Sequence, residues 1–199
     1  MSALSYRPDI DGLRAIAVLS VVLYHFDVSG VGGGFVGVDV FFVISGYLIT
    51  GIIHSELAKG EFTLARFYER RARRIFPALF VMLLATMVAG LFLLLPSDLA
   101  RLGQATIATI LFLSNVLYYR QSGYFDEGSD FNALLHTWSL GVEEQFYVGL
   151  PLLLMAVHRY RPHWLVRVVA LCALLSFAAC VVAQPLMAKL VFFLSPFRA

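Results

Sequence analysis

Apolar runs separated by short polar segments give this chain its pattern. A helix needs about 17 to 25 mostly apolar residues to cross a bilayer. Five runs meet this length, at 10–26, 36–53, 78–95, 139–157 and 166–182. The pattern predicts an all-α protein, a polytopic bundle of about five transmembrane helices. No internal repeat or low-complexity linker interrupts the sequence, so we expect one domain over residues 1–199.

Composition and charge agree with a membrane protein. Hydrophobic residues make up 60% of the chain and charged residues only 14%, whereas a soluble domain is about a quarter charged. Basic residues gather in 54–77, and the positive-inside rule makes this loop cytoplasmic. We therefore expect a cytoplasmic N-terminus and an extracytoplasmic glycine-rich turn at 27–35.

The segment 97–137 is harder to place. Its apolar run, 105–118, is short for a span and ends in polar residues. If it crossed, the next span would carry three arginines to the outside, against the positive-inside rule: Arg159, Arg161 and Arg167. We therefore predict a re-entrant or interfacial segment, which also leaves an acidic group outside: Asp126, Glu127 and Asp130.

Two ionisable residues lie within the first apolar run. Arg14 and His25 are separated by about three helical turns, so both face the same way. Charges on a spanning helix are costly and normally face a polar interior. A snorkelling arginine and an interfacial histidine would explain the same spacing, so this pair alone leaves function open.

Asp39 strengthens the functional interpretation. It lies near the outer end of the second run, at a depth similar to that of His25 if the short turn makes the two spans antiparallel neighbours. A carboxylate bonded to one imidazole nitrogen fixes the tautomer and makes the other nitrogen a better base. Asp27 competes for this role, and a carboxylate at a helix N-terminus is the structural alternative for Asp39. For the glycines between the spans, 30–37, we expect a turn with close helix packing.

An arginine-rich segment precedes the third run. Arg66, Arg70 and Arg74 recur every four residues and share one helical face. Guanidinium groups match phosphate geometry, as a phosphorylated donor would require. A topology signal that touches anionic lipid head groups explains the same residues, and spacing alone favours this second interpretation.

A polar motif opens the fourth run. His136, Ser139 and Glu143 stand at i, i+3 and i+7 and share a helical face. A hydrolytic triad on one continuous helix would be poorly angled, and the nucleophile-elbow context is absent. Adjacent glutamates, Glu143 and Glu144, are costly at the entrance of a span. They predict a polar cavity.

Together, four motifs resemble the acyltransferase-3 family of integral membrane O-acyltransferases. They cover roughly Tyr6 to Pro151, and their fixed order is far more specific than any one of them. In order, they are Arg14 with His25, Phe41 to Ile49, Phe67 to Pro77, and His136 to Tyr147.

The resemblance implies transfer of an acyl group, usually acetyl, from cytosolic acyl-CoA to a hydroxyl of an extracytoplasmic glycan or lipid-linked sugar, such as lipopolysaccharide O-antigen. It places the protein in the cytoplasmic (inner) membrane of a bacterium, with acyl-CoA as co-substrate and no metal. His25 would be the general base or an acyl relay, Arg14 would line the passage, and Asp39 would support His25. The CoA phosphates would meet Arg70, Arg71, Arg73 and Arg74. The cavity or substrate site would include Ser45, Tyr47, His136, Trp138, Ser139, Glu143, Glu144 and Gln145.

One departure concerns size. Members of the family have about ten spans, twice the number expected here, and residues 189–199 look like the start of another apolar segment. We therefore expect a truncated, inactive fragment that needs further C-terminal spans, and the branch it resembles often adds an SGNH-type domain. The alternative function is a transporter or carrier subunit for an anionic substrate, which would use the same polar stripe without acyl chemistry.

Overall fold

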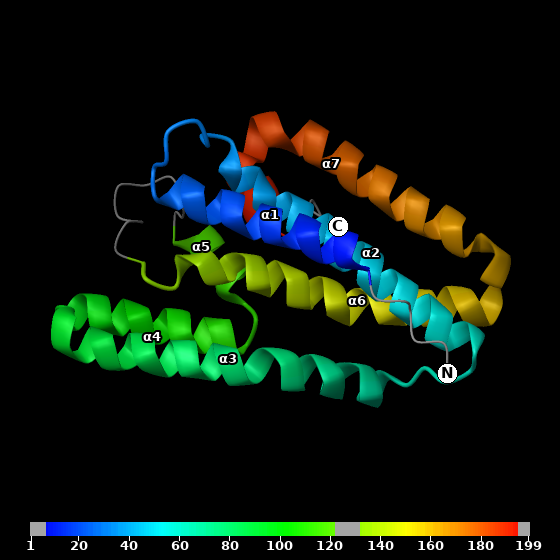
Figure 1. The fold of residues 1–199 in the computed structure, drawn as a ribbon, viewed down its shortest axis with the longest axis horizontal. Helices are drawn as coiled ribbons and strands as arrows, with labels where there is room; N and C mark the ends of the chain where they lie inside the picture. The colour runs from blue at the N-terminus through cyan, green and yellow to red at the C-terminus, as the bar shows by residue number, and fades with distance from the viewer. Residues whose placement is uncertain (1–6, 122–131, 195–199) are drawn as a thin grey trace.

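The computed structural model describes residues 7–121 and 132–194 (Figure 1). These described residues form helices and no strand, which confirms the all-α prediction. The acidic group at 126–130 lies outside them. The α-helices are α1 (Pro8–His25), α2 (Gly37–Ala58), α3 (Leu64–Leu93), α4 (Pro96–Ile110), α5 (Ser114–Arg120), α6 (Trp138–Tyr160) and α7 (Leu165–Phe193).

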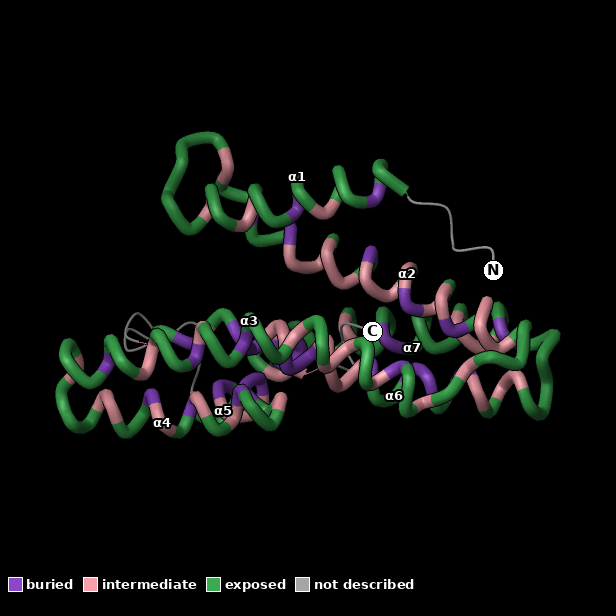
Figure 2. Tube along the Cα trace, turned by 60° about the horizontal axis from the view of Figure 1, so that its bottom comes forward, coloured by how far each residue is buried: buried purple, intermediate pink, exposed green. Residues whose placement is uncertain are grey.

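Four helical segments are long and apolar enough to cross a membrane: Gly34–Ala58, Leu64–Leu93, Leu135–Tyr160 and Pro162–Phe193. The predicted first span, α1, is not among them because Asp9, Asp11 and Arg14 all fall within its 18 residues. It packs mainly on α2, and Figure 2 shows it apart from the other helices, with most of its surface exposed.

Glycines bring α1 and α2 together, as the sequence suggested. A Cβ atom on Gly34 would lie 2.2 Å from the Ser20 carbonyl oxygen, and one on Gly37 would lie 2.3 Å from that of Ala17. Only a residue without a side chain permits this approach. The turn therefore holds the end of α1, which carries His25, against the start of α2.

The basic segment 54–77 is mostly helical, which corrects the prediction of a loop. Helix α2 continues to Ala58, and α3 runs unbroken from Leu64 through Pro77 to Leu93. Arginine, alanine and glutamate are good helix formers, so the basic motif extends the third span instead of ending before it. At 30 residues, α3 is about 45 Å long and exceeds the hydrocarbon core of about 30 Å.

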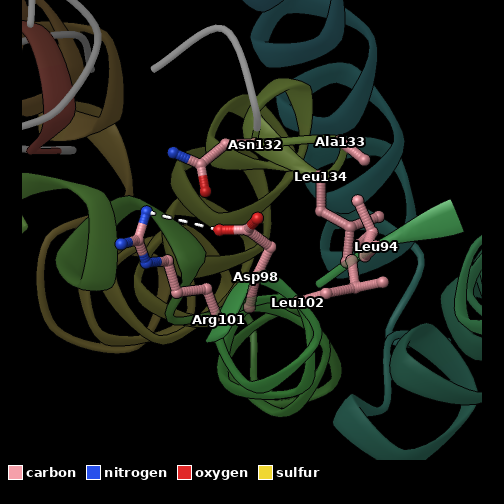
Figure 3. Close-up of a pocket in the computed structure, with 8 residues that line it drawn as sticks. Leu94, Asp98, Arg101, Leu102, Asn132, Ala133 and Leu134 are labelled. Atoms are coloured by element: carbon pink, nitrogen blue, oxygen red, sulfur yellow. Dashed lines mark ion pairs between the residues drawn. The ribbon is translucent and has the colours of Figure 1, made fainter. Parts of the chain in front are cut away.

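The segment after α3 is re-entrant in form. Helix α4 has 15 residues, about 22 Å, and is too short to cross. The chain then turns at Phe112, which has a φ of 55°, and α5 heads back (Figure 1). Asp98, near the start of this hairpin, and Ala133, which follows it, line the same small hollow (Figure 3). Both ends of the hairpin therefore lie at the same end of the molecule.

Helix α7 extends beyond its predicted end at residue 182. It contains Pro185, bends at Met187 (φ −143°, ψ 53°) and continues through Lys189 to Phe193. Proline removes a helical hydrogen bond and so permits the bend. The kink divides α7, so residues 188–193 form a short helical piece of their own. That 189–199 begin another apolar segment stays a prediction, and 195–199 lie outside the described residues.

Candidate active site

A buried ion pair joins α3 to α6. The Arg71 guanidinium lies 3.1 Å from the Glu144 carboxylate, and both side chains are only 13% exposed. The guanidinium carbon is also 3.9 Å from the centre of the Tyr147 ring, a favourable cation–π distance. Their motifs predict donor binding for Arg71 and a cavity for Glu144. The structure brings these two separate motifs into direct contact.

A hollow of about 280 Å³ opens beside this ion pair. It lies between two packed clusters, one centred on Phe67 and Leu154 and the other on Leu83 and Trp138. Its polar lining includes Tyr68, Arg71, Glu144 and Gln145, and its apolar lining includes Ala72, Ile75, Phe76, Leu111, Phe112, Leu113 and Val148. The hollow therefore joins a charged end to an apolar body.

Further polar groups continue along α6. The Tyr147 hydroxyl donates a hydrogen bond to Glu143, and the Ser45 side chain of α2 lies beside the same phenol. Because the Arg71 guanidinium covers the Tyr147 ring, Glu143 and Ser45 belong to one polar network with the ion pair. Neither Glu143 nor Ser45 lines the hollow, so their predicted place in a cavity remains a prediction.

The other predicted donor-binding arginines lie nearer the surface of α3. Arg70 pairs with Glu56 at 2.9 Å, and Arg73 pairs with Glu69 at 2.7 Å. Arg74 is exposed and forms no ion pair with any residue that the structure describes. Exposed pairs contribute only about 0–1 kcal/mol, so an incoming phosphate could replace these carboxylates.

His25 occupies the last turn of α1. Its Nδ1 lies 2.8 Å from the Val21 carbonyl oxygen. Since a carbonyl only accepts, Nδ1 carries the proton and Nε2 of the neutral ring is left with its lone pair. The Val21 carbonyl thus orients the ring. Asp39 lies in the first turn of α2, and its predicted support of His25 remains a prediction. His25 is also within electrostatic reach of His136.

Arg14 lies between α1 and α2. Its guanidinium carbon is 5.3 Å from the centre of the Phe41 ring, and its closest carboxylate oxygen, on Asp11, is 3.5 Å away. The side chain is 28% exposed. Arg14 therefore faces α2, and its predicted place beside a passage remains a prediction.

The remaining predicted cavity residues occupy different environments. Trp138 is buried among aromatic rings, with the ring of Phe192 4.5 Å away. Ser139 donates to the His136 carbonyl oxygen at 3.0 Å. Tyr47 is 61% exposed on α2. These residues do not line the hollow beside Arg71.

Asn115 and Gln145 dock the re-entrant hairpin onto α6, and only Gln145 was among the predicted site residues. Asn115 is fully buried and donates to the Gln145 amide oxygen at 3.2 Å and the Phe193 carbonyl oxygen at 3.0 Å. In return, the Gln145 amide donates to Asn115 at 2.9 Å and to the Phe112 carbonyl oxygen at 3.0 Å. The only available signal was an asparagine within an apolar run.

A second hollow lies near the α3–α4 corner, where Asp98 and Arg101 are 3.7 Å apart (Figure 3). Its volume is about 10 Å³, room for about one water molecule. It is too small to hold a substrate.

A membrane helix bundle with a charged, partly apolar hollow defines this chain as an integral membrane protein with an internal polar site. Residues 7–193 match the sequence model of the acyltransferase-3 family, described as an acyltransferase domain. The chain belongs to this family, which confirms the resemblance seen in its motifs.

Two relatives from Staphylococcus aureus illustrate the similarity. O-acetyltransferase OatA of strain NCTC 8325 / PS 47 is 36% identical over 180 residues, which cover 89% of this chain and 30% of that protein. A provisionally named O-acetyltransferase, SAS0844 of strain MSSA476, is 42% identical over 153 residues, covering 76% and 25%. The chain thus spans about a third or less of the length of these relatives. No solved structure matches it significantly.

Proposed function

We propose that this chain forms part of an O-acyltransferase of a bacterial inner membrane. It takes an acyl group, preferentially acetyl, from cytosolic acyl-CoA and transfers it to a hydroxyl of an extracytoplasmic glycan or lipid-linked sugar, such as lipopolysaccharide O-antigen. Family membership and the names of the relatives support O-acyl transfer. The observation that carries the proposal is the open hollow that unites Arg71 of the basic motif with Glu144 of the α6 motif.

The basic end of α3 would receive the CoA phosphates. Arg70 and Arg73 can exchange their carboxylate partners for phosphate, and Arg74 adds an exposed charge. Arg71 lies deeper, beside the hollow. With the N-terminus and this basic end cytoplasmic, the donor would enter from the inside.

His25, in the last turn of α1, would act on the acceptor hydroxyl. Its unprotonated Nε2 takes the proton from the acceptor hydroxyl as the hydroxyl oxygen attacks the thioester carbonyl carbon. The new C–O bond forms, the C–S bond breaks, and the CoA thiolate leaves and takes up the proton. Arg14 would line the route between the two sides. Transfer through an acyl group carried on His25 uses the same residue.

The test supplies labelled acetyl-CoA to the inside of sealed membranes that contain the complete product of the gene. We expect labelled ester on external glycan with the wild-type protein, loss of most label with His25→Ala, and retention of label with His163→Ala, which replaces an exposed histidine before α7. If His25→Ala still binds CoA, the loss of labelled ester arises in a step after donor binding.

Two other outcomes would count against the proposal. Equal labelling by wild type and His25→Ala would remove His25 from the mechanism. No label and no CoA binding with either protein would favour the transporter alternative, for which His25→Gln should change only the pH dependence of transport.

A further inference from the structure

The hollow beside Arg71 combines a small polar end with an apolar body. Arg71 and Glu144 stand at one end, while Ile75, Phe76 and Phe112 line the body. Its volume of about 280 Å³ lies just below the range of about 300–1,000 Å³ for pockets that hold drug-sized ligands. It suits a ligand with one polar group and a short apolar chain.

Arg71 lines the polar end of the hollow beside Glu144. One face of its guanidinium covers Tyr147, and one terminal nitrogen binds Glu144. Its Nε, in contrast, is buried and has no hydrogen-bond partner among the described residues. Buried donors without a partner are rare in folded proteins. This nitrogen has no surface open to the hollow, so a ligand there meets other atoms of Arg71.

The apolar wall is held in a fixed position. The rings of Phe76 and Phe112 stack with centroids 6.1 Å apart and planes 14° apart. Phe112 has a φ of 55°, unusual for a residue with a side chain, and Gln145 donates to its carbonyl oxygen at 3.0 Å. A Cβ on Gly141 would lie only 3.3 Å from that oxygen. Strained residues held by their surroundings cluster at ligand sites.

We propose that this hollow is the acyl-chain pocket of the enzyme. The acyl chain of the bound donor lies against Ile75, Phe76 and Phe112, with its thioester toward the Arg71–Glu144 end. The stacked wall limits chain length and so selects short acyl groups. This inference rests on the proposed function, because it identifies where that function's donor places its acyl chain.

Substitutions that change the hollow's size test this assignment. Phe76→Ala enlarges it and Ala72→Leu fills it. Phe92→Ala and Ala78→Leu are matched controls on the same helix, since neither residue lines the hollow. The complete protein in membranes is given acetyl-, butyryl- or hexanoyl-CoA, and ester formation is measured for each donor.

We expect Phe76→Ala to raise the ratio of butyryl to acetyl transfer about tenfold and Ala72→Leu to lower it by a similar factor, because a methylene in an apolar pocket changes selectivity by about 10- to 200-fold. The two controls should keep the wild-type ratio. An unchanged ratio in both pocket variants would overturn the pocket assignment while leaving acyl transfer intact. If wild type transfers no acyl group from any donor, the proposed function itself has failed.

A binding measurement keeps the pocket testable without transfer. A short-chain acyl-CoA with a diazirine on its acyl end is photolysed in the membranes, and the labelled peptides are identified. Label on Phe76 or Phe112 that excess acetyl-CoA removes supports the pocket. Label that acetyl-CoA does not remove would overturn the proposal, because it would show that the hollow takes up apolar chains without recognising the donor. Absence of label on both residues would also overturn it.

Discussion

At the scale of single residues, the buried ion pair has the clearest energetic consequence. Removing one partner of such a pair leaves the other charge buried and costs about 3–5 kcal/mol. We expect Arg71→Gln to lower the unfolding temperature in detergent strongly, and the double variant Arg71→Gln with Glu144→Gln to recover part of the loss because no lone charge remains. Thermal unfolding monitored by tryptophan fluorescence provides the measurement.

The exposed pair between Arg73 and Glu69 is the matched control. Its side chains are 79% and 58% exposed, so Arg73→Gln should change stability by less than about 1 kcal/mol. Equal effects of Arg71→Gln and Arg73→Gln would mean that water reaches the Arg71 side chain as freely as it reaches the surface.

The hydrogen bonds between the Asn115 and Gln145 side chains also depend on single residues, but they hold a whole helix, α5, against α6. Asn115→Ala leaves the Gln145 amide and the Phe193 carbonyl without their partners, at about 1–3 kcal/mol for each buried group. We expect faster hydrogen exchange in α5 and in the turn at Phe112. Gln104→Ala, which removes an exposed amide pair to Gln121, should leave exchange there unchanged. If both variants exchange alike, Asn115 does not hold the hairpin.

At the scale of elements, glycine packing decides where His25 lies. Gly37→Ala would place a Cβ against the Ala17 carbonyl oxygen, so α1 must move away from α2. We expect a loss of roughly 1–3 kcal/mol, typical of overpacking, together with reduced acyl transfer. Gly51→Ala, on the same helix with open space around it, should stabilise α2 by about 0.5–1 kcal/mol. Unfolding temperatures and transfer rates of both variants check this; similar loss in both would contradict the packing argument.

Helices were predictable from the sequence wherever one apolar run corresponds to one element. The hairpin of α4 and α5 agrees in form with the predicted re-entrant segment, and its place in the membrane stays a prediction. The unbroken α3 was not predictable from the sequence, since polar residues at 64–77 look like a loop when hydropathy alone is considered. The bend at Met187 and the docking of Phe193 against Asn115 depend on contacts between residues far apart in sequence, which no local pattern reveals.

The same limit applies to the site. Arg71 and Glu144 were both selected as functional residues, but for different roles, and their contact depends on how α3 and α6 cross. Phe76 and Phe112 look like ordinary core residues in the sequence. Their position in the hollow follows from a backbone turn with positive φ, which the residue type did not predict.

At the scale of the whole molecule, we predict that the two ends of the re-entrant hairpin face the same side of the membrane. Asp98 and Ala133 line one small hollow, whereas a crossing segment would separate them by the bilayer thickness. In a background with Cys172→Ala and Cys180→Ala, single cysteines at Ser97 and Ala133 should react with a membrane-impermeant maleimide from the outside, as should one at Ser29 in the glycine-rich turn. Lys59→Cys, between α2 and the basic start of α3, should react only from the inside. Each variant is also labelled after permeabilisation, so that a cysteine shielded by lipid is not mistaken for one on the opposite side.

Reaction of Ser97→Cys and Ala133→Cys from opposite sides would mean that the segment crosses. The basic end of α7 would then lie outside with Arg167, and the hollow beside Arg71 could no longer be approached from the side on which cytosolic acyl-CoA is found.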